Sequence, residues 1–289
     1  MNVLETILSS LPTEAEPITS VCVGLHWTSV CSRSCGLASS LCDEGPHGHH
    51  VVRDVGHLHL KSAQELASWA LSGHLLEASL GMAAINSLLD HNLPEAVDTN
   101  AFDFIYRLGE GKNISVIGHF PFTDRLKSIA RHLWVIEKQP QNGDLPESAA
   151  PTYLPWSDVV AITGTALINH TFDQLIQYRA RHAKVVVLGA SSPFSPVLFD
   201  HGVDFISGSI VVDEKAALLS IQQGATFTHI NGVRLVYPME KEAMRTIQAG
   251  GVFGYRIDKG ALRGSIGRHE YRHPLVHYGS LGAGLAARF

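Results

Sequence analysis

Apolar residues in the first hundred positions follow two periods, one typical of strands and one typical of helices. Between residues 21 and 28 large apolar side chains take alternate positions, which predicts a strand with one buried face. After a turn at Ser32, further short strands are predicted at 35–38 and 51–55. Between residues 62 and 90 the period is three to four, which predicts two helices, the first capped by Ser62. These elements predict a small α+β domain over residues 1–100.

From about residue 101 short apolar strands alternate with helical segments, a pattern that leads to parallel pairing through helical crossovers. The strands are almost continuously apolar, so both faces of their sheet should be buried. We place the strands at 114–117, 133–136, 159–162, 185–188 and 203–206, and the helices at 124–132, 171–181, 196–201 and 213–222. The predicted fold class is α/β, with a Rossmann-like, doubly wound parallel sheet over residues 101–260.

Two segments do not follow this alternation. Residues 139–156 contain four prolines and one glycine, which predicts a long connection near the carboxyl edge of the sheet that could form a lid. Residues 261–289 are rich in Gly, Arg and His and show no apolar period. We expect an irregular C-terminal extension there.

Composition narrows the class of protein. A chain of 289 residues with 45% hydrophobic content can bury a large core. The net charge of −5 offers no basic face for phosphate backbones, so nucleic acid is not an expected partner. No segment approaches the roughly 18 apolar residues of a membrane span, and the start MNVLETILSS lacks the basic residues of a signal peptide. We expect a cytoplasmic protein without membrane partners, and a homo-oligomer remains open.

Cysteine and histidine cluster near the N-terminus. A cytoplasmic chain keeps its thiols reduced, so no disulfide is expected, and the cysteine spacing is not that of structural zinc sites. The histidines could chelate a metal, but Gly45 and Pro46 predict a hairpin tip in which they would splay, the interpretation that we favour. The residues are Cys22, Cys31, Cys35 and Cys42, and His47, His49, His50, His57 and His59.

A polar turn follows the third predicted strand of the parallel sheet, at the edge where such sheets bind ligands. Thr163, Gly164 and Thr165 lead from this strand into a predicted helix, with Asn169 one turn inside. Backbone N–H groups and hydroxyls at a helix start favour an anionic or strongly polar ligand group. Capping alone would need one such residue, so we favour a binding loop over a simple cap.

Glu137 lies at the end of the second predicted strand, 19 residues after Gly118. Dinucleotide folds place an acid near this spacing on ribose hydroxyls, but the first turn reads G-H-F-P instead of G-x-G-x-x-G, which disfavours NAD or FAD. Glu137 could hold a ribose without pyrophosphate, ligate a metal, or be a surface acid. His119 could ligate a metal or exchange protons, although a hydrogen bond to its own loop is the simpler role. Ser191 lacks a nucleophile elbow, so hydrolase chemistry has little support.

Several motifs together resemble one known family. They are GLHWTSV, CGLA and LLEASLGMAAINSLL in the first domain, and TGTALINHT and LGASSPFSPVLFDHGVDFISGSIV in the second. They resemble the two-domain proteins described as putative heavy-metal chelation proteins, domain of unknown function family 364. The resemblance covers residues 1–255.

This resemblance implies an N-terminal domain similar to the enolase N-terminal fold, a Rossmann-like domain, and a ligand site in the cleft between them. Carried over by position, the ligand-binding candidates are Thr28, Cys35, Gly36, Asn86, Gly118, Glu137, Thr163, Gly164, Thr165, Asn169, Ser191, Pro193 and Gly208. His119 and Glu137 are the candidate metal ligands, with a divalent metal ion as the suggested cofactor.

Two functions are consistent with these features. The first is a protein that binds a metal ion, a metal chelate or a small polar ligand in the interdomain cleft. The alternative is a transferase-like enzyme that acts on a nucleotide-like or S-adenosylmethionine-like molecule at the Rossmann strand ends.

Overall fold

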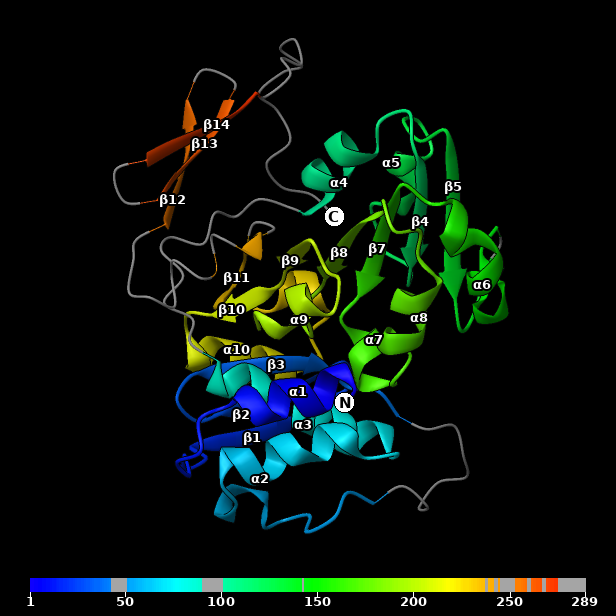
Figure 1. The fold of residues 1–289 in the computed structure, drawn as a ribbon. Helices are drawn as coiled ribbons and strands as arrows, with labels where there is room; N and C mark the ends of the chain where they lie inside the picture. Colours follow the sequence, from blue (N-terminus) through cyan, green and yellow to red (C-terminus); the bar gives the residue numbers. More distant parts are fainter. Residues whose placement is uncertain are drawn as a thin grey trace.

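The computed structural model describes residues 1–42, 51–89, 101–141, 143–236, 239–241 and 244, and the backbone of 253–258, 261–266 and 269–274. A small N-terminal layer of helices and an antiparallel sheet packs against a larger layer built on a parallel sheet (Figure 1). The predicted α/β class with a small preceding α+β part is confirmed. In the described residues, each helix is too short or too polar to cross a bilayer.

The N-terminal sheet has three antiparallel strands in the order β1-β2-β3. These are β1 (Ser20–Val23), β2 (Trp27–Cys31) and β3 (Cys35–Ser39). The single strand predicted at 21–28 is wrong, because the chain reverses between Val23 and Trp27 while the apolar alternation continues through the turn. The strand predicted at 51–55 is also wrong, since this stretch contains a turn in which Asp54 has a φ of 53°.

Cys31 and Cys35 lie opposite each other where β2 turns into β3, and they form a disulfide. The expectation that no disulfide forms is therefore wrong for this pair, because the hairpin register brings the two residues together. Cys22 and Cys42 are free thiols. Burial raises the pKa of the Cys22 thiol.

The helices of this part are α1 (Val3–Ser10), α2 (Ala63–Ala67) and α3 (Leu75–Leu88). Helix α3 packs on β2 and β3, and α2 packs on α3. Ser62 caps α2 as predicted, and the Ser62 backbone N–H donates a hydrogen bond to the Glu65 carboxylate. Helix α3 is buried from Glu77 to Leu88 because it lies between β3 and the short 3-10 helix η2 (Ser68–Leu71). This helix forms the centre of the N-terminal core.

The large sheet has six parallel strands in the order β6-β5-β4-β7-β8-β9. The strands are β4 (Asn113–Ile117), β5 (His132–Glu137), β6 (Leu145–Pro146), β7 (Val159–Thr163), β8 (Lys184–Leu188) and β9 (Phe205–Ser207). This order is that of doubly wound Rossmann-like sheets, in which the chain changes direction across the sheet between its first and fourth strands, here β4 and β7. The predicted sheet is confirmed.

Alternate residues of β7 pack on opposite faces of this sheet. Val159 and Ala161 belong to a core with α4 (Ala101–Gly109) and α5 (Thr123–Leu126). Val160 and Ile162 belong to the main core, which continues into α1 and α3 of the N-terminal layer. The main core therefore joins both parts of the molecule.

Most predicted helices of this part are shorter than expected. The helix predicted at 124–132 ends at Leu126, because the chain turns there to enter β5. The other three predicted helices correspond to α8 (Phe172–Tyr178), α9 (Val197–Asp200) and α10 (Glu214–Gln222), and the separate short helix α7 (Thr165–Ile168) follows β7. The connection 139–156 contains β6, the 3-10 helices η3 (Glu147–Ala149) and η4 (Leu154–Trp156), and α6 (Ala150–Tyr153), so it extends the sheet.

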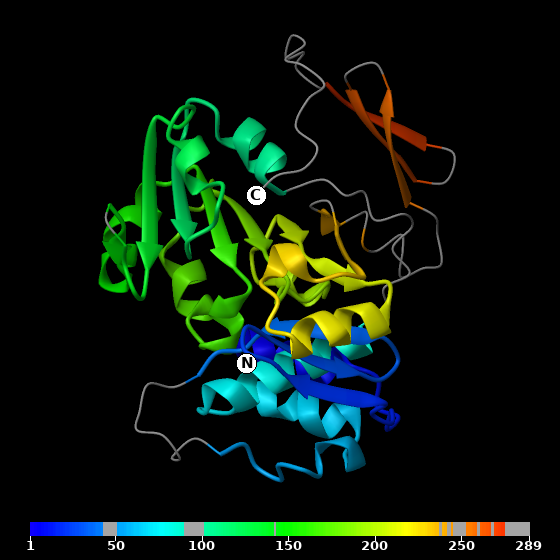
Figure 2. The same cartoon turned by 180° about the vertical axis from the view of Figure 1, so that it is seen from behind.

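The segment after β9 returns to the N-terminal sheet. It forms the antiparallel pair β10 (Ser209–Val211) and β11 (Val233–Leu235), and α10 packs on β1 and β2. Leu37 of β3 shares a small core with Ala217, Ile221 and Ile230. Figure 2 shows α10, in yellow, along the blue strands, so this sheet lies between α3 and α10.

The C-terminal region forms a further, three-stranded antiparallel sheet. Its strands are β12 (Phe253–Asp258), β13 (Ala261–Ile266) and β14 (His269–Pro274). The expectation of an irregular extension after residue 261 is therefore wrong for 261–266 and 269–274. Gly264, His269 and His273 stand where an alternating strand would have large apolar residues, which hides the period in the sequence.

Candidate functional site

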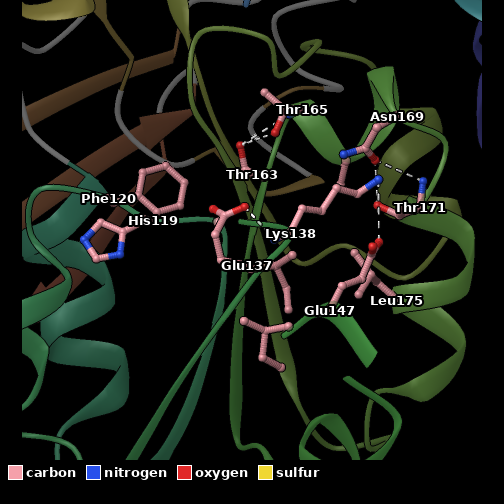
Figure 3. A pocket seen from close by; sticks show the side chains of 14 residues that line it. His119, Phe120, Glu137, Lys138, Glu147, Thr163, Thr165, Asn169, Thr171 and Leu175 are labelled. Carbon is pink, nitrogen blue, oxygen red and sulfur yellow. Dashed lines mark hydrogen bonds and ion pairs between the residues drawn. The ribbon is translucent and has the colours of Figure 1, made fainter. Parts of the chain in front are cut away.

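A pocket of about 240 Å³ opens at the carboxyl ends of β4, β5 and β7 (Figure 3). This is the position at which doubly wound sheets bind ligands, beside the strands where the sheet order reverses. Gly118 directly follows β4 and has a φ of +97°, a conformation that favours glycine. The polar lining residues are His119, Glu137, Lys138, Glu147, Thr163, Thr165, Asn169 and Thr171, and the others are Ile117, Gly118, Phe120, Ile136, Ala166 and Leu175.

The Thr163 turn holds its own polar groups together. The Thr163 and Thr165 hydroxyl oxygens are 3.0 Å apart, and the Thr165 backbone N–H donates to Thr163 Oγ1 over 3.3 Å. The expectation that Asn169 lies inside a longer helix is wrong: α7 has one turn, and Asn169 is its C-cap before His170, which has a φ of 61°. A helix of one turn is too short for its N-terminus to favour an anion. The argument from a helix start for an anionic ligand at this turn therefore does not hold.

Asn169 instead presents its amide to the pocket (Figure 3). Its Oδ1 accepts hydrogen bonds from the Thr171 backbone N–H at 3.3 Å and from the Thr171 hydroxyl at 2.7 Å. With Oδ1 engaged in this way, Nδ2 is the group through which Asn169 can donate to a ligand.

Glu137 is half-buried at the end of β5, the strand beside β4. Its Oε1 accepts a hydrogen bond from the Lys138 backbone N–H at 2.7 Å, which fixes the carboxylate. In Figure 3 the carboxylate lies below Thr163 and beside the ring of Phe120. A carboxylate held at a strand end in this way can accept hydrogen bonds from ligand hydroxyls through its second oxygen.

His119 is held by a neighbouring acid. Its Nδ1 lies 3.2 Å from Asp144 Oδ2, and the Asp144 side chain is only 4% exposed. The same oxygen accepts the Gln141 backbone N–H at 3.0 Å, so Asp144 ties His119 to the loop before β6. This pair holds the His119 ring, which lines the pocket.

The two predicted metal ligands, His119 and Glu137, line the same pocket from adjacent strands. Structural zinc sites use four protein ligands and catalytic ones three. Within the described ranges, however, no three side chains of the His, Cys, Asp and Glu types come together in a way that could hold a metal ion. The described residues therefore do not fit a metal ion bound by the protein alone. His47, His49 and His50 lie outside the described residues.

Lys138 and Glu147 are site residues that the sequence reasoning missed. The Lys138 Nζ lies 3.7 Å from Glu147 Oε1, and both side chains are about half exposed. Lys138 directly follows Glu137, which could have drawn attention to it. Glu147 lies in the proline-rich connection 139–156, which offered no such signal.

The other candidates of the second part lie outside the pocket. Gly164 allows close packing, since a Cβ there would lie 2.6 Å from the Ser192 backbone nitrogen, and Gly208 packs against the Phe194 ring. Ser191 Oγ accepts a hydrogen bond from the Ser39 backbone N–H at 2.9 Å, so it links the loop after β8 to β3. Pro193 is buried in the same loop.

The N-terminal candidates also lie outside the pocket. Thr28 Oγ1 and Ser40 Oγ form a hydrogen bond of 2.9 Å, and Asn86 Nδ2 donates to the Leu37 carbonyl over 2.8 Å. Cys35 is in the disulfide, and Gly36 allows β3 to approach α3. All residues that line the pocket come from 117–175, so it does not lie in the expected interdomain cleft.

Comparisons with known proteins agree with this architecture. Residues 4–89 match the family model DUF4213 and residues 100–240 match DUF364, and both families carry the description "Putative heavy-metal chelation". An uncharacterized protein of Methanocaldococcus jannaschii is 29% identical over 219 residues, which span 73% of this chain and 83% of that protein.

Two solved structures share the fold. A protein of unknown function from the DUF364 family of Desulfitobacterium hafniense DCB-2 matches with a TM-score of 0.72 and 24% identity over 83% of this chain and 98% of its own. A DUF364-family protein from Pyrococcus horikoshii matches with a TM-score of 0.64 and 20% identity over 82% and 98%. By these matches the chain carries a DUF4213 domain followed by a DUF364 domain.

Proposed function

We propose that this protein binds a small polar ligand with neighbouring hydroxyl groups, and that Glu137 is the anchor for those hydroxyls. The observation that carries the proposal is the position of the Glu137 carboxylate, at the end of the strand beside β4 and in a pocket with the Thr163 and Thr165 hydroxyls. Rossmann-like proteins use an acid at this strand end to hold a ribose.

The size of the pocket favours a small ligand, such as a sugar phosphate, a nucleoside or a mononucleotide, over a dinucleotide. About 240 Å³ is below the range of roughly 300–1,000 Å³ that is usual for ligand pockets. The turn after β4 also offers no pyrophosphate site, since Phe120 lines the pocket there and α5 has a single turn. A dinucleotide is therefore disfavoured, and a nucleoside-like substrate of a transferase-like enzyme would use the same anchor.

The test of this proposal is the substitution Glu137→Gln. Thermal shift of the wild-type protein is measured against nucleosides, S-adenosylmethionine and sugar phosphates, because a ligand at one hundred times its Kd adds about 2.7 kcal/mol of stability. We expect Glu137→Gln to weaken binding of the active compound about 10- to 100-fold, since a hydrogen bond to a charged group contributes about 1.5–3 kcal/mol. Glu110→Gln, at an exposed position outside the pocket, is the matched control. Equal affinity of the wild type and Glu137→Gln would contradict the proposal.

A second candidate ligand is a metal that arrives in a small organic chelator. The supporting observation is that His119 and Glu137 line one pocket, since two protein donors can complete a coordination shell that a chelator has mostly filled. Equilibrium dialysis with Ni²⁺ alone and with Ni²⁺ citrate is the test. We expect stoichiometric binding of the citrate complex only, and its loss in His119→Ala. Tight binding of Ni²⁺ alone, unchanged in His119→Ala, would contradict this candidate.

A further inference from the structure

We infer that the ligand carries an anionic group, a phosphate or a carboxylate, and that Lys138 binds it. The inference rests on the proposed function, because it assigns a second recognition point in the same pocket. Glu137 and Lys138 are adjacent in sequence and both line the pocket. In Figure 3 the Lys138 side chain runs away from the Glu137 carboxylate toward Asn169 and Thr171. The pocket therefore has a carboxylate at one end and an ammonium group at the other.

The ammonium group of Lys138 is only weakly engaged in the free protein. Among the described residues its one ion-pair partner is Glu147, at 3.7 Å. Strong charge-assisted hydrogen bonds between nitrogen and oxygen are shorter, about 2.7–2.9 Å. The Lys138 side chain is 46% exposed and that of Glu147 is 48% exposed, so water weakens the pair further. A ligand anion can replace Glu147 at small cost.

The groups around Lys138 complete a site for anionic oxygens. Asn169 Oδ1 is engaged by Thr171, so the Asn169 amide offers its N–H groups as donors on the same side of the pocket. Glu147 opposes an anion there, but it lies on η3 with an exposed side chain that can turn into solvent. Glu137 and His119 are the other titratable residues that line the pocket, and both lie toward the opposite end in Figure 3. His119 Nδ1 is 3.2 Å from Asp144 Oδ2. The pocket should accordingly select a ligand that has hydroxyls at one end and an anion at the other.

Matched ligand pairs separate this inference from the proposed function. The compounds are ribose against ribose 5-phosphate and ribonate, and adenosine against its 2′-, 3′- and 5′-monophosphates, with Kd measured by isothermal titration calorimetry. We expect the best anionic member of a pair to bind about ten-fold more tightly than its neutral partner, or more. Ribose 5-phosphate and ribonate distinguish phosphate from carboxylate as the source of the anion.

Substitutions of the ion pair provide the second readout. Lys138→Met should reduce the affinity ratio of the anionic and neutral members to about one. Glu147→Gln should raise the affinity of the anionic member several-fold, since it removes the competing carboxylate. Lys184→Met is the matched control, because Lys184 begins β8 at the opposite edge of the sheet and pairs with Asp204 at 2.7 Å.

The possible outcomes are distinct. Equal affinity of the anionic and neutral members, with Glu137→Gln still weakening both, would overturn the anion site and leave the hydroxyl anchor intact. A preference for the anionic member that persists in Lys138→Met would also overturn the assignment of Lys138. Failure of every compound to bind the wild type would overturn both the anion site and the proposed function.

Discussion

Replacement of Gly81 by alanine is expected to destabilise the protein by roughly 3 kcal/mol, near the upper end of what overpacking usually costs. Gly81 lies in α3 where this helix touches η2. A Cβ at this position would lie 2.0 Å from the Ala70 backbone nitrogen and 2.5 Å from the Trp69 carbonyl carbon. Both neighbours are main-chain atoms, so no side-chain rotation relieves the clash. Alanine gains about 1 kcal/mol of helix propensity over glycine, which is too little to offset a shift of two packed helices.

Urea unfolding of the full chain measures this effect. Gly73→Ala is the matched control, because a Cβ at Gly73 meets no atom within 4 Å. The control should change the unfolding free energy by only a few tenths of a kcal/mol. Equal unfolding free energies of Gly81→Ala and Gly73→Ala would contradict the close approach of α3 and η2. Gly36→Ala should resemble Gly81→Ala, since its Cβ would lie 2.1 Å from the Ala83 carbonyl oxygen.

Replacement of Glu77 by glutamine is expected to destabilise the protein by about 1–3 kcal/mol, the usual cost of leaving a buried hydrogen-bonding group unsatisfied. The Glu77 side chain is 6% exposed, and its Oε2 lies 2.9 Å from the Arg53 guanidinium. Oε1 also accepts the Arg53 backbone N–H at 3.0 Å, and Oε2 accepts the Ser72 hydroxyl at 2.7 Å. A glutamine amide would turn one acceptor into a donor that faces Arg53 or Ser72, so at least one of these bonds is lost.

The same substitution should change how stability depends on pH. Burial alone would raise the pKa of Glu77, but hydrogen bonds from Ser72 and Arg53 outweigh it and hold the pKa below its usual value. A carboxyl with a lowered pKa in the folded state contributes stability above its unfolded pKa, about 4.3, and loses it as pH falls through the folded pKa. The difference between wild type and Glu77→Gln should therefore be constant above pH ~5 and shrink below pH ~4. Denaturation of both proteins from pH 3 to 7, with Glu110→Gln as control, measures it, and a difference that grows toward pH 3 would contradict the assignment.

The sequence predicts the parallel sheet well because its strands are buried on both faces. Runs such as Val185 to Leu188 have no polar residue to compete with a strand assignment, and tertiary packing then agrees with the local pattern. The Ser62 cap is predictable because it is local: both hydrogen bonds of the capping box join Ser62 to Glu65, three residues away. The prediction fails where the local apolar pattern and the tertiary structure disagree. After Val23 the apolar alternation continues, but the chain reverses into a hairpin.

The candidate site was predictable only in part. Gly118, Glu137, Thr163, Thr165 and Asn169 share one pocket because parallel strands end at the same edge of a sheet. Glu147 reaches the pocket only because the connection after β5 folds back over the carboxyl edge of the sheet. No local sequence pattern predicts this path of the chain. Ser191 and Gly164 are equally conspicuous in sequence, yet the structure uses them to pack the loop after β8 against β3 and β7.

The return of the chain from β9 to the N-terminal sheet limits how the protein can be divided. A fragment that stops before α10 would leave Leu37 and Trp27 facing water, since Ala217, Ile221 and Phe227 are the residues that cover them. We therefore expect residues 4–89 to need the segment after β9 in order to fold, even though a separate family model matches them. Both halves should melt together in one cooperative transition.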